Sequence, residues 1–324
     1  MHLFIEHETI YRYEPPARFT TQYIRLTPRQ HGNLQVWSWN LIGPRKMTQF
    51  NDGFGNVVHV LSVTEAHEEV RLKVTGEVWT QETAGVLPPE FEAFSPLYYA
   101  NHTRLTAADA AIKDFAETFR TAVASDRLSG LHDVMTALNK RVRYSIGSTN
   151  AASSAAEAFA KGEGVCQDHA HIFLSICRTL GVPSRYLSGY LWTEGAETSY
   201  EANHAWAEAF IERLGWVSFD VANCVAATEA YVRVAQGRDY LDAAPVRGLW
   251  RGDGTEALTV SVRVTQGQRA QQQHQGERQQ DELQHDDKRQ GPQIQQGEKH
   301  TQGAQQRQGE SQLGQRYQQD QQQQ

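Results

Sequence analysis

The stretch from Gly162 to Cys177 constrains this chain more than any other part of its sequence. Gly162 and Gly164 allow the backbone to turn sharply, and Cys166 follows at once. An apolar stripe of helical period then begins, with Phe173, Ile176, Cys177 and Leu180. Cys166 is therefore predicted to lie in the first turn of a helix, where free N–H groups and the helix dipole favour an anion. Because this environment stabilises a thiolate, we interpret Cys166 as a nucleophile.

The overall charge of the chain limits its partners. In 324 residues, 31 Lys and Arg stand against 38 Asp and Glu, a formal net charge of -7. No global basic field favours nucleic acid or anionic lipid, so neither is expected as a partner. Three cysteines without framework spacing favour a reducing compartment. The N-terminus lacks the basic region of a signal peptide and no apolar run is long enough to span a membrane, so we expect a cytoplasmic protein.

Pattern and composition divide the chain into four parts. Residues 1–84 show period-two alternation between turn signals, which predicts an N-terminal antiparallel β module. Residues 85–105 are expected to form a linker, and residues 106–265 an α+β core. Residues 266–324 are rich in Gln with almost no large apolar side chains, and such a segment is expected to be disordered. No feature of the sequence specifies an oligomeric state.

Within the core, helical and extended patterns alternate. Thr106 is predicted to cap a first helix, and the apolar positions of residues 131–142 predict a second. Ser154 and Glu157 form a capping box for a short helix before Gly162. After the Cys166 helix, the pattern predicts strands over 185–192, 204–211 and 216–221, a helix over 228–235, and a final strand over 258–264.

A thiolate nucleophile needs a base and a group that orients the base. His204 opens one predicted strand, and Asp220 ends the next. If the two strands form a hairpin, both residues lie at its open end. A two-residue turn at Arg213 and Leu214 would set Asp220 opposite Ala207, so contact between His204 and Asp220 requires a bulge or a longer loop.

Three motifs in this order resemble the transglutaminase-like superfamily: Gly164-Val165-Cys166-Gln167-Asp168-His169-Ala170, His204-Ala205-Trp206, and Trp216-Val217-Ser218-Phe219-Asp220. The N-terminal region, with Leu26-Thr27-Pro28-Arg29 and Asp52-Gly53-Phe54-Gly55-Asn56, resembles the N-terminal module of bacterial proteins of this group. The resemblance covers about residues 1–264. It departs from the family at Val221, where a proline is common. The resemblance implies a papain-like α+β core in which a helix bearing the cysteine packs on an antiparallel sheet bearing His and Asp.

The resemblance also implies roles for individual residues. Cys166 would be the nucleophile, His204 the base and acid, and Asp220 the orienting carboxylate of an acyl-transfer reaction on a peptide or protein amide. The oxyanion would be held by the Cys166 N–H and a second donor, for which Tyr144 is a candidate, although a core aromatic at that position is the simpler interpretation. Gln167 and Trp206 are further candidates near the oxyanion or the substrate, although packing beneath the site is enough to explain Trp206. Hydrolysis is favoured over protein crosslinking.

Other interpretations remain open at this point. Cys166, His169 and His204 could supply three zinc ligands, but the sequence has no paired Cys-x2-Cys or His-Glu-x-x-His, so no metal or cofactor is expected. Cys177 and Cys224 are predicted to be packed thiols. The segment Arg238-Asp239-Tyr240 could line the cleft or form a structural cluster. A non-catalytic module that binds peptides in the same cleft is the alternative from another class.

Overall fold

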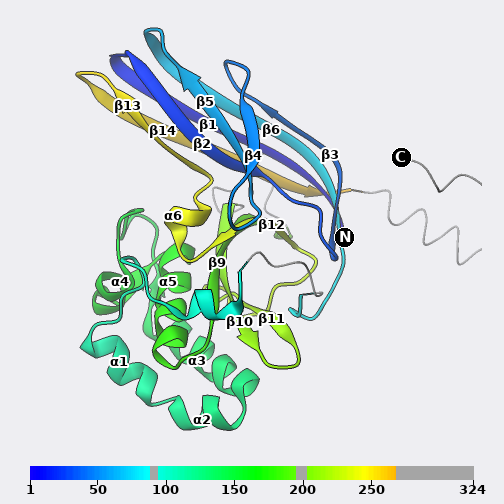
Figure 1. Cartoon of the computed structure of the whole chain (residues 1–324), viewed down its shortest axis with the longest axis vertical. Coiled ribbons are helices and arrows are strands. Elements are labelled where there is room, and N and C mark those ends of the chain that lie inside the picture. Colours follow the sequence, from blue (N-terminus) through cyan, green and yellow to red (C-terminus); the bar gives the residue numbers. More distant parts are fainter. Residues whose placement is uncertain (88–93, 195–202, 268–324) are drawn as a thin grey trace, which may run out of the picture. The chain divides into compact units, whose positions relative to one another are not determined.

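The computed structural model describes residues 1–87, 94–194 and 203–267. Within these ranges the chain forms three four-stranded antiparallel sheets and a group of helices (Figure 1). No helix among these residues is both long enough and apolar enough to cross a membrane. The first strands are β1 (His2–Ala17), β2 (Phe19–Thr27), β3 (Leu34–Ile42), β4 (Thr48–Asn51), β5 (Val57–Val63) and β6 (His67–Thr80).

The N-terminal strands form two sheets with a shared apolar core. Their strand orders are β14-β1-β6-β3 and β13-β2-β5-β4, where β13 (Val246–Arg251) and β14 (Thr255–Gln266) come from the C-terminal end of the described chain. The strands alternate between buried and exposed residues, as expected where each sheet has one face inward. The residues buried between the sheets are Tyr13, Ala17, Ile24, Leu26, Leu61, Val63, Val70, Leu72 and Val74. An antiparallel β module is therefore present at this end of the chain.

The structure corrects the predicted extent of the core. Strand β13 (Val246–Arg251) pairs with β2, and β14 (Thr255–Gln266) pairs with β1. The segment assigned to the end of the core therefore returns to the N-terminal sheets. The strand pattern of residues 258–264 was correct, but periodicity does not identify the partner of a strand. The predicted tail beyond residue 267 lies outside the described residues.

The core contains the helices and the third sheet. Helix α3 (Arg127–Arg141) agrees with its predicted amphipathic pattern and α4 (Ala155–Lys161) with its predicted capping box, whereas Asp109 rather than Thr106 caps α1 (Ala110–Glu117). The predicted helix over 228–235 is wrong, because strand β12 (Tyr231–Gly237) occupies most of this segment. The elements are α1 (Ala110–Glu117), α2 (Arg120–Ser125), α3 (Arg127–Arg141), β7 (Arg143–Tyr144), α4 (Ala155–Lys161), β8 (Glu163–Gly164), α5 (Cys166–Thr179), β9 (Ser184–Leu191), β10 (Asn203–Ile211), β11 (Gly215–Phe219), β12 (Tyr231–Gly237) and α6 (Tyr240–Ala243).

Helix α5 packs on the core sheet, whose strand order is β11-β10-β9-β12 (Figure 1). The middle of the β10 face toward the helix carries Ala205, Ala207 and Ala209, and these small side chains allow a close approach. All but one of the α5 residues from Asp168 to Thr179 are buried. This arrangement confirms the predicted α+β, papain-like architecture, with the cysteine helix packed on an antiparallel sheet.

The predicted linker is partly structured. Val86 forms a bridge with Val217, and the Leu87 N–H donates to Trp216 O, so this segment extends the edge of the core sheet. A short 3-10 helix, η1 (Pro96–Ala100), follows, and residues 88–93 between them lie outside the described ranges. The predicted linker therefore contributes to the core instead of only connecting two parts.

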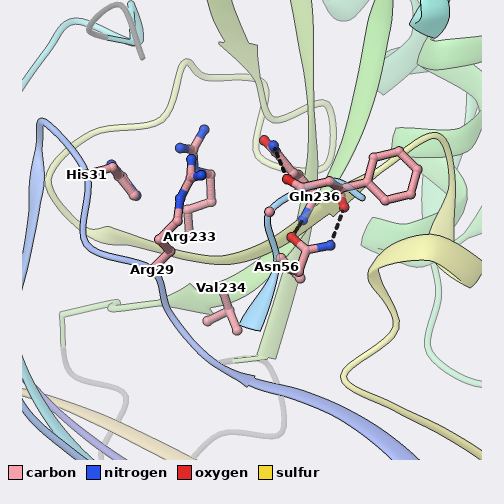
Figure 2. A pocket seen from close by; sticks show the side chains of 9 residues that line it. Arg29, His31, Asn56, Arg233, Val234 and Gln236 are labelled. Carbon is pink, nitrogen blue, oxygen red and sulfur yellow. Dashed lines mark hydrogen bonds between the residues drawn. The ribbon is translucent and has the colours of Figure 1, made fainter. Parts of the chain in front are cut away.

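A buried carboxamide joins the N-terminal module to β12 (Figure 2). Asn56 Nδ2 donates to Gln236 O at 2.8 Å, and Asn56 Oδ1 accepts from the Gln236 N–H at 2.9 Å. The side chain thus pairs with β12 as a neighbouring strand would. A cavity beside this junction is lined by residues that include Arg29, His31 and Arg233 (Figure 2).

Replacing Asn56 by alanine should destabilise the fold. The variant leaves the Gln236 N–H and C=O buried without partners, and we expect a loss of about 2–4 kcal/mol in the free energy of unfolding. Urea denaturation measures this change. Asn40→Ala is the matched control, because Asn40 is exposed on β3, and it should change stability by less than about 0.5 kcal/mol. Equal effects of the two variants would contradict this role of Asn56.

Candidate active site

Cys166 is the first residue of α5, as its sequence context predicted. The left-handed Gly162, with φ +70°, ends α4, and the two-residue strand β8 leads directly into the N-cap Val165. Strand β8 pairs in parallel with β7, which sets Tyr144 beside Gly164. The cysteine is half-buried, as are its neighbours Val165 and Gln167, at the start of a helix that is buried from Asp168 to Arg178. Its sulfur therefore lies where the helix dipole favours an anion and a small molecule can reach it.

The hairpin of β10 and β11 brings His204 and Asp220 together. Ile211 pairs with Gly215, so the connecting loop holds residues 212–214, and Gly215 has the positive φ of 90° that this connection requires. Continuing the register by one residue sets Asp220 level with Trp206, on the same sheet face as His204. His204 Nε2 donates to Asp220 Oδ2 at 2.7 Å across this diagonal. A loop of three residues, longer than the two-residue turn, thus allows the contact between His204 and Asp220.

The Asp220 carboxylate is fully buried and accepts several hydrogen bonds. Tyr231 Oη and Asn223 Nδ2 each donate to Oδ2 at 2.7 Å, and the Asn223 N–H donates to Oδ1 at 3.2 Å. Burial alone would raise the pKa of Asp220, but the bonds from His204, Tyr231 and Asn223 hold that pKa below its ordinary value. Asp220 is therefore a carboxylate that orients its neighbours.

His204 lies between this carboxylate and the cysteine. With Nε2 committed to Asp220, Nδ1 is the nitrogen left to interact with the Cys166 sulfur. Burial alone would lower the pKa of His204, but the Asp220 carboxylate and the Cys166 sulfur outweigh burial and raise that pKa above its ordinary value. The imidazolium form is therefore favoured next to the sulfur, as a thiolate–imidazolium pair requires.

Trp206 and Tyr231 fix the plane of the imidazole. The Trp206 ring lies nearly parallel to His204, with centroids 6.2 Å apart, and contacts Tyr231 edge to face at 5.3 Å. Gly189 of β9 pairs with His204 on one side and with β12 on the other. A Cβ atom at residue 189 would lie 2.1 Å from Val232 O, so only glycine fits there. Trp206 is 2% exposed and supports the imidazole from within the sheet face.

Tyr231 and Asn223 contact Asp220 in the candidate site, and sequence reasoning missed both. Tyr231 fell within the predicted helix over 228–235, and Asn223 within an unassigned turn. The alternation in Tyr231-Val232-Arg233-Val234 was a usable signal for a strand. No local pattern could have revealed that this strand reaches Asp220, because Tyr231 lies on β12 and Asp220 follows β11, which is at the other end of the strand order.

The remaining predicted site residues have different surroundings. Tyr144 is 42% exposed and its ring lies 6.2 Å from that of His169, so the interpretation as a core aromatic is wrong. The Gln167 amide donates to Ala151 O at 3.5 Å, toward the loop before α4. Cys177 is fully buried, and Cys224 packs at the edge of the core.

The zinc alternative does not fit the surroundings of His169. Both of its ring nitrogens face backbone carbonyls, with Nδ1 3.0 Å from Val165 O and Nε2 2.9 Å from Val142 O. Neither nitrogen is available as a metal ligand. Among the described residues, no three His, Cys, Asp or Glu side chains form a metal-binding group.

The segment Arg238-Asp239-Tyr240 forms a structural cluster. Arg238 pairs with Asp242 at 2.8 Å, and Asp239 caps α6 through the Leu241 N–H. The Tyr240 N–H donates to Nε2 of the buried His171. Burial, together with the nearby Arg178, lowers the pKa of His171 to about 3, so this histidine is a neutral acceptor. These contacts attach α6 to α5.

The fold and the site define a papain-like α+β protein with a half-buried thiol at a helix N-terminus beside a histidine–aspartate pair. Two family profiles match the chain: the transglutaminase-like superfamily over residues 113–221, and the bacterial transglutaminase-like N-terminal region over residues 3–79. The chain belongs to the transglutaminase-like superfamily, as its motifs indicated.

Relatives of similar length span most of the chain. An uncharacterized protein of Mycobacterium leprae (strain TN) is 30% identical over 282 residues, which cover 81% of this chain and 97% of that protein. An uncharacterized protein of Mycobacterium tuberculosis (strain H37Rv) is 27% identical over 288 residues, covering 80% and 91%. A structure from Cytophaga hutchinsonii, solved as a candidate cysteine protease, matches with a TM-score of 0.66 at 22% identity, over 82% of this chain and 90% of that one. At this identity the structural likeness establishes the fold alone.

Removing the Tyr231 hydroxyl tests its support of Asp220. Tyr231→Phe deletes one hydrogen bond to a buried carboxylate, and we expect a loss of about 1.5–3 kcal/mol in unfolding free energy at pH 7. Because the lowered pKa of Asp220 stabilises the fold above about pH 3.8 and this contribution is lost on acidification, the difference between the variant and wild type should shrink at acid pH. Urea denaturation at several pH values measures it. Tyr23→Phe, at an exposed tyrosine, is the control and should be neutral.

Proposed function

We propose that this chain catalyses thiol-dependent acyl transfer on a peptide or protein amide, with water as the usual acceptor. Cys166 is the proposed nucleophile, His204 the base and acid, and Asp220 the residue that orients His204. One observation carries the proposal: His204 lies between the hydrogen-bonded Asp220 carboxylate and a thiol at a helix N-terminus. Water is the proposed acceptor because it is always present at high concentration.

The proposed reaction has two halves. The Cys166 thiolate attacks the amide carbonyl carbon, and the resulting oxyanion accepts a hydrogen bond from the Cys166 N–H. The His204 imidazolium gives its Nδ1 proton to the leaving nitrogen, the C–N bond breaks, and a thioester remains. His204 then takes a proton from water, whose oxygen attacks the thioester, and the thiolate departs as the acid forms. Asp220 keeps the imidazole in one orientation throughout.

Labelling of Cys166 tests the nucleophile and its partner. We expect iodoacetamide to modify Cys166 near neutral pH in preference to the buried Cys177, and His204→Ala to slow this labelling by about 100-fold. Mass spectrometry of digested full-length protein measures both rates. His59→Ala, on β5 of the N-terminal module, is the matched control and should label at the wild-type rate.

A screen of peptide and glutamine-amide substrates identifies the reaction. Release of ammonia or an amine without incorporation of an added amine supports hydrolysis. Incorporation of a labelled amine would assign the chain to crosslinking instead. If no substrate reacts and Cys166 is not labelled, the proposal fails and a peptide-binding module becomes the better interpretation.

The pH profile tests the role of Asp220. In the wild type, the raised pKa of His204 keeps the imidazolium present as the pH rises past about 6.5, so kcat/KM should fall only at a more alkaline pH. The stability linked to this proton is complete below about pH 6.5 and is lost as the pH rises through the folded value. Asp220→Asn removes the charge, and we expect the alkaline limb of the kcat/KM profile to move toward pH 6.5. An alkaline limb that does not move would contradict the role of Asp220.

A further inference from the structure

The peptide group between Val165 and Cys166 is held from its carbonyl side by His169. Val165 O accepts from the His169 backbone N–H at 3.1 Å, which is the first hydrogen bond of α5. His169 Nδ1 lies 3.0 Å from the same oxygen. One residue thus contacts this carbonyl through both its backbone and its side chain, although an ordinary helical turn uses the backbone alone.

Holding this carbonyl fixes the direction of the Cys166 N–H. In a trans peptide the C=O and the N–H point in opposite directions in one plane. Because Val165 O points into α5 toward His169, the Cys166 N–H points out of the helix N-terminus. No acceptor among the described residues takes this N–H. It is therefore a donor directed to the side on which the Cys166 thiol is half-exposed.

The preceding peptide group is held by Asp168. The Val165 N–H donates to Asp168 Oδ2 at 2.8 Å, and Thr149 Oγ1 donates to the same oxygen at 2.6 Å. The carboxylate reaches this position because residue 164 is glycine, where a Cβ atom would lie 2.6 Å from the Asp168 Cβ. Both peptide groups that flank Val165 are thus anchored by side chains of α5.

The second ring nitrogen of His169 ties the same helix turn to β7. Nε2 lies 2.9 Å from Val142 O, directly before the strand that carries Tyr144. Carbonyl oxygens only accept, so a ring nitrogen bonds the carbonyl that it faces when that nitrogen carries the proton, and a proton on Nδ1 completes the contact with Val165 O. His169 is 1% exposed, which leaves water little access to either contact.

We propose that His169, with Asp168, is a positioning residue that holds the Cys166 N–H as a preformed oxyanion donor. This inference rests on the proposed acyl-transfer function. The backbone hydrogen bond from the His169 N–H could hold the Val165 carbonyl alone, but hydrogen bonds in the first turn of a helix open readily. The added side-chain bonds prevent rotation of the peptide planes on either side of Val165. The donor then needs no reorganisation when charge develops on the substrate oxygen.

Two substitutions at residue 169 separate its two contacts. The Asn amide nitrogen is as far along the side chain as Nδ1, so His169→Asn retains a donor for Val165 O. The Gln amide nitrogen is as far as Nε2, so His169→Gln retains a donor for Val142 O alone. Each full-length variant is compared in two reactions at Cys166: acylation by p-nitrophenyl acetate, which forms an oxyanion, and alkylation by iodoacetamide, which forms none. Cys166→Ala gives the background of both.

The ratio of the acylation rate to the alkylation rate is the readout. We expect His169→Gln to lower this ratio at least about tenfold, with alkylation within about twofold of wild type, and His169→Asn to keep the ratio within about threefold. Thr149→Val, which removes a donor to Asp168 from outside the helix, should lower the ratio by a smaller factor and tests the inference if residue 169 tolerates neither change.

Three results would overturn the inference. The first is an unchanged ratio in both His169→Gln and Thr149→Val. The second is an equal loss in His169→Asn and His169→Gln. The third is a parallel fall of acylation and alkylation, which marks a general disturbance of the helix. Failure of the proposed function looks different, because wild-type Cys166 would then react with neither reagent faster than a free thiol.

Discussion

The buried carboxylate of Asp220 is the constraint on which the site depends. A charge removed from water is costly unless hydrogen bonds replace its hydration shell, and here His204, Tyr231 and Asn223 supply them. These donors come from β10, from β12 and from the turn after β11, so the carboxylate can be satisfied only when the sheet is assembled in its full order. The geometry of the His204 imidazole is therefore a consequence of forming the sheet.

The two halves of the site are stabilised by different means. On the sheet, His204 is positioned by a buried charge and by the Trp206 ring, which together fix both the direction and the plane of the imidazole. On α5, the cysteine depends on backbone geometry, and the glycine before Val165 makes room for the carboxylate of Asp168. In the proposed reaction, the helix side would therefore control the oxyanion donor, whereas the sheet side would control proton transfer. A substitution on one side should affect one of these steps more than the other, and this asymmetry makes the steps separable.

The sequence predicted the parts of the fold and of the site that depend on local patterns. The helix over 131–142, the capping box at Ser154 and the position of Cys166 at a helix start follow from side chains within a few residues of one another. The placement of β13 and β14 on the N-terminal sheets and the contact of Tyr231 with Asp220 are long-range pairings, to which period-two alternation gives no guide. The helix expected over 228–235 does not form for a related reason: pairing of this segment with β9 outweighs its weak local preference for a helix. His204 and Asp220 were identified because each marks an end of its strand.

Strand β12 connects the N-terminal module to the candidate site. At its start Tyr231 donates to Asp220, and five residues later Gln236 pairs with the Asn56 carboxamide of the module. A strand held at both ends has little freedom to slide, because a shift of one residue would move Tyr231 to the opposite face of the sheet. The turn of residues 52–56 is itself fixed, since Asp52 accepts from the Phe54 and Asn56 N–H groups and pairs with Arg25. The N-terminal module thus sets the register of the strand that supports the orienting carboxylate, which gives a physical reason for both regions to occur in one chain.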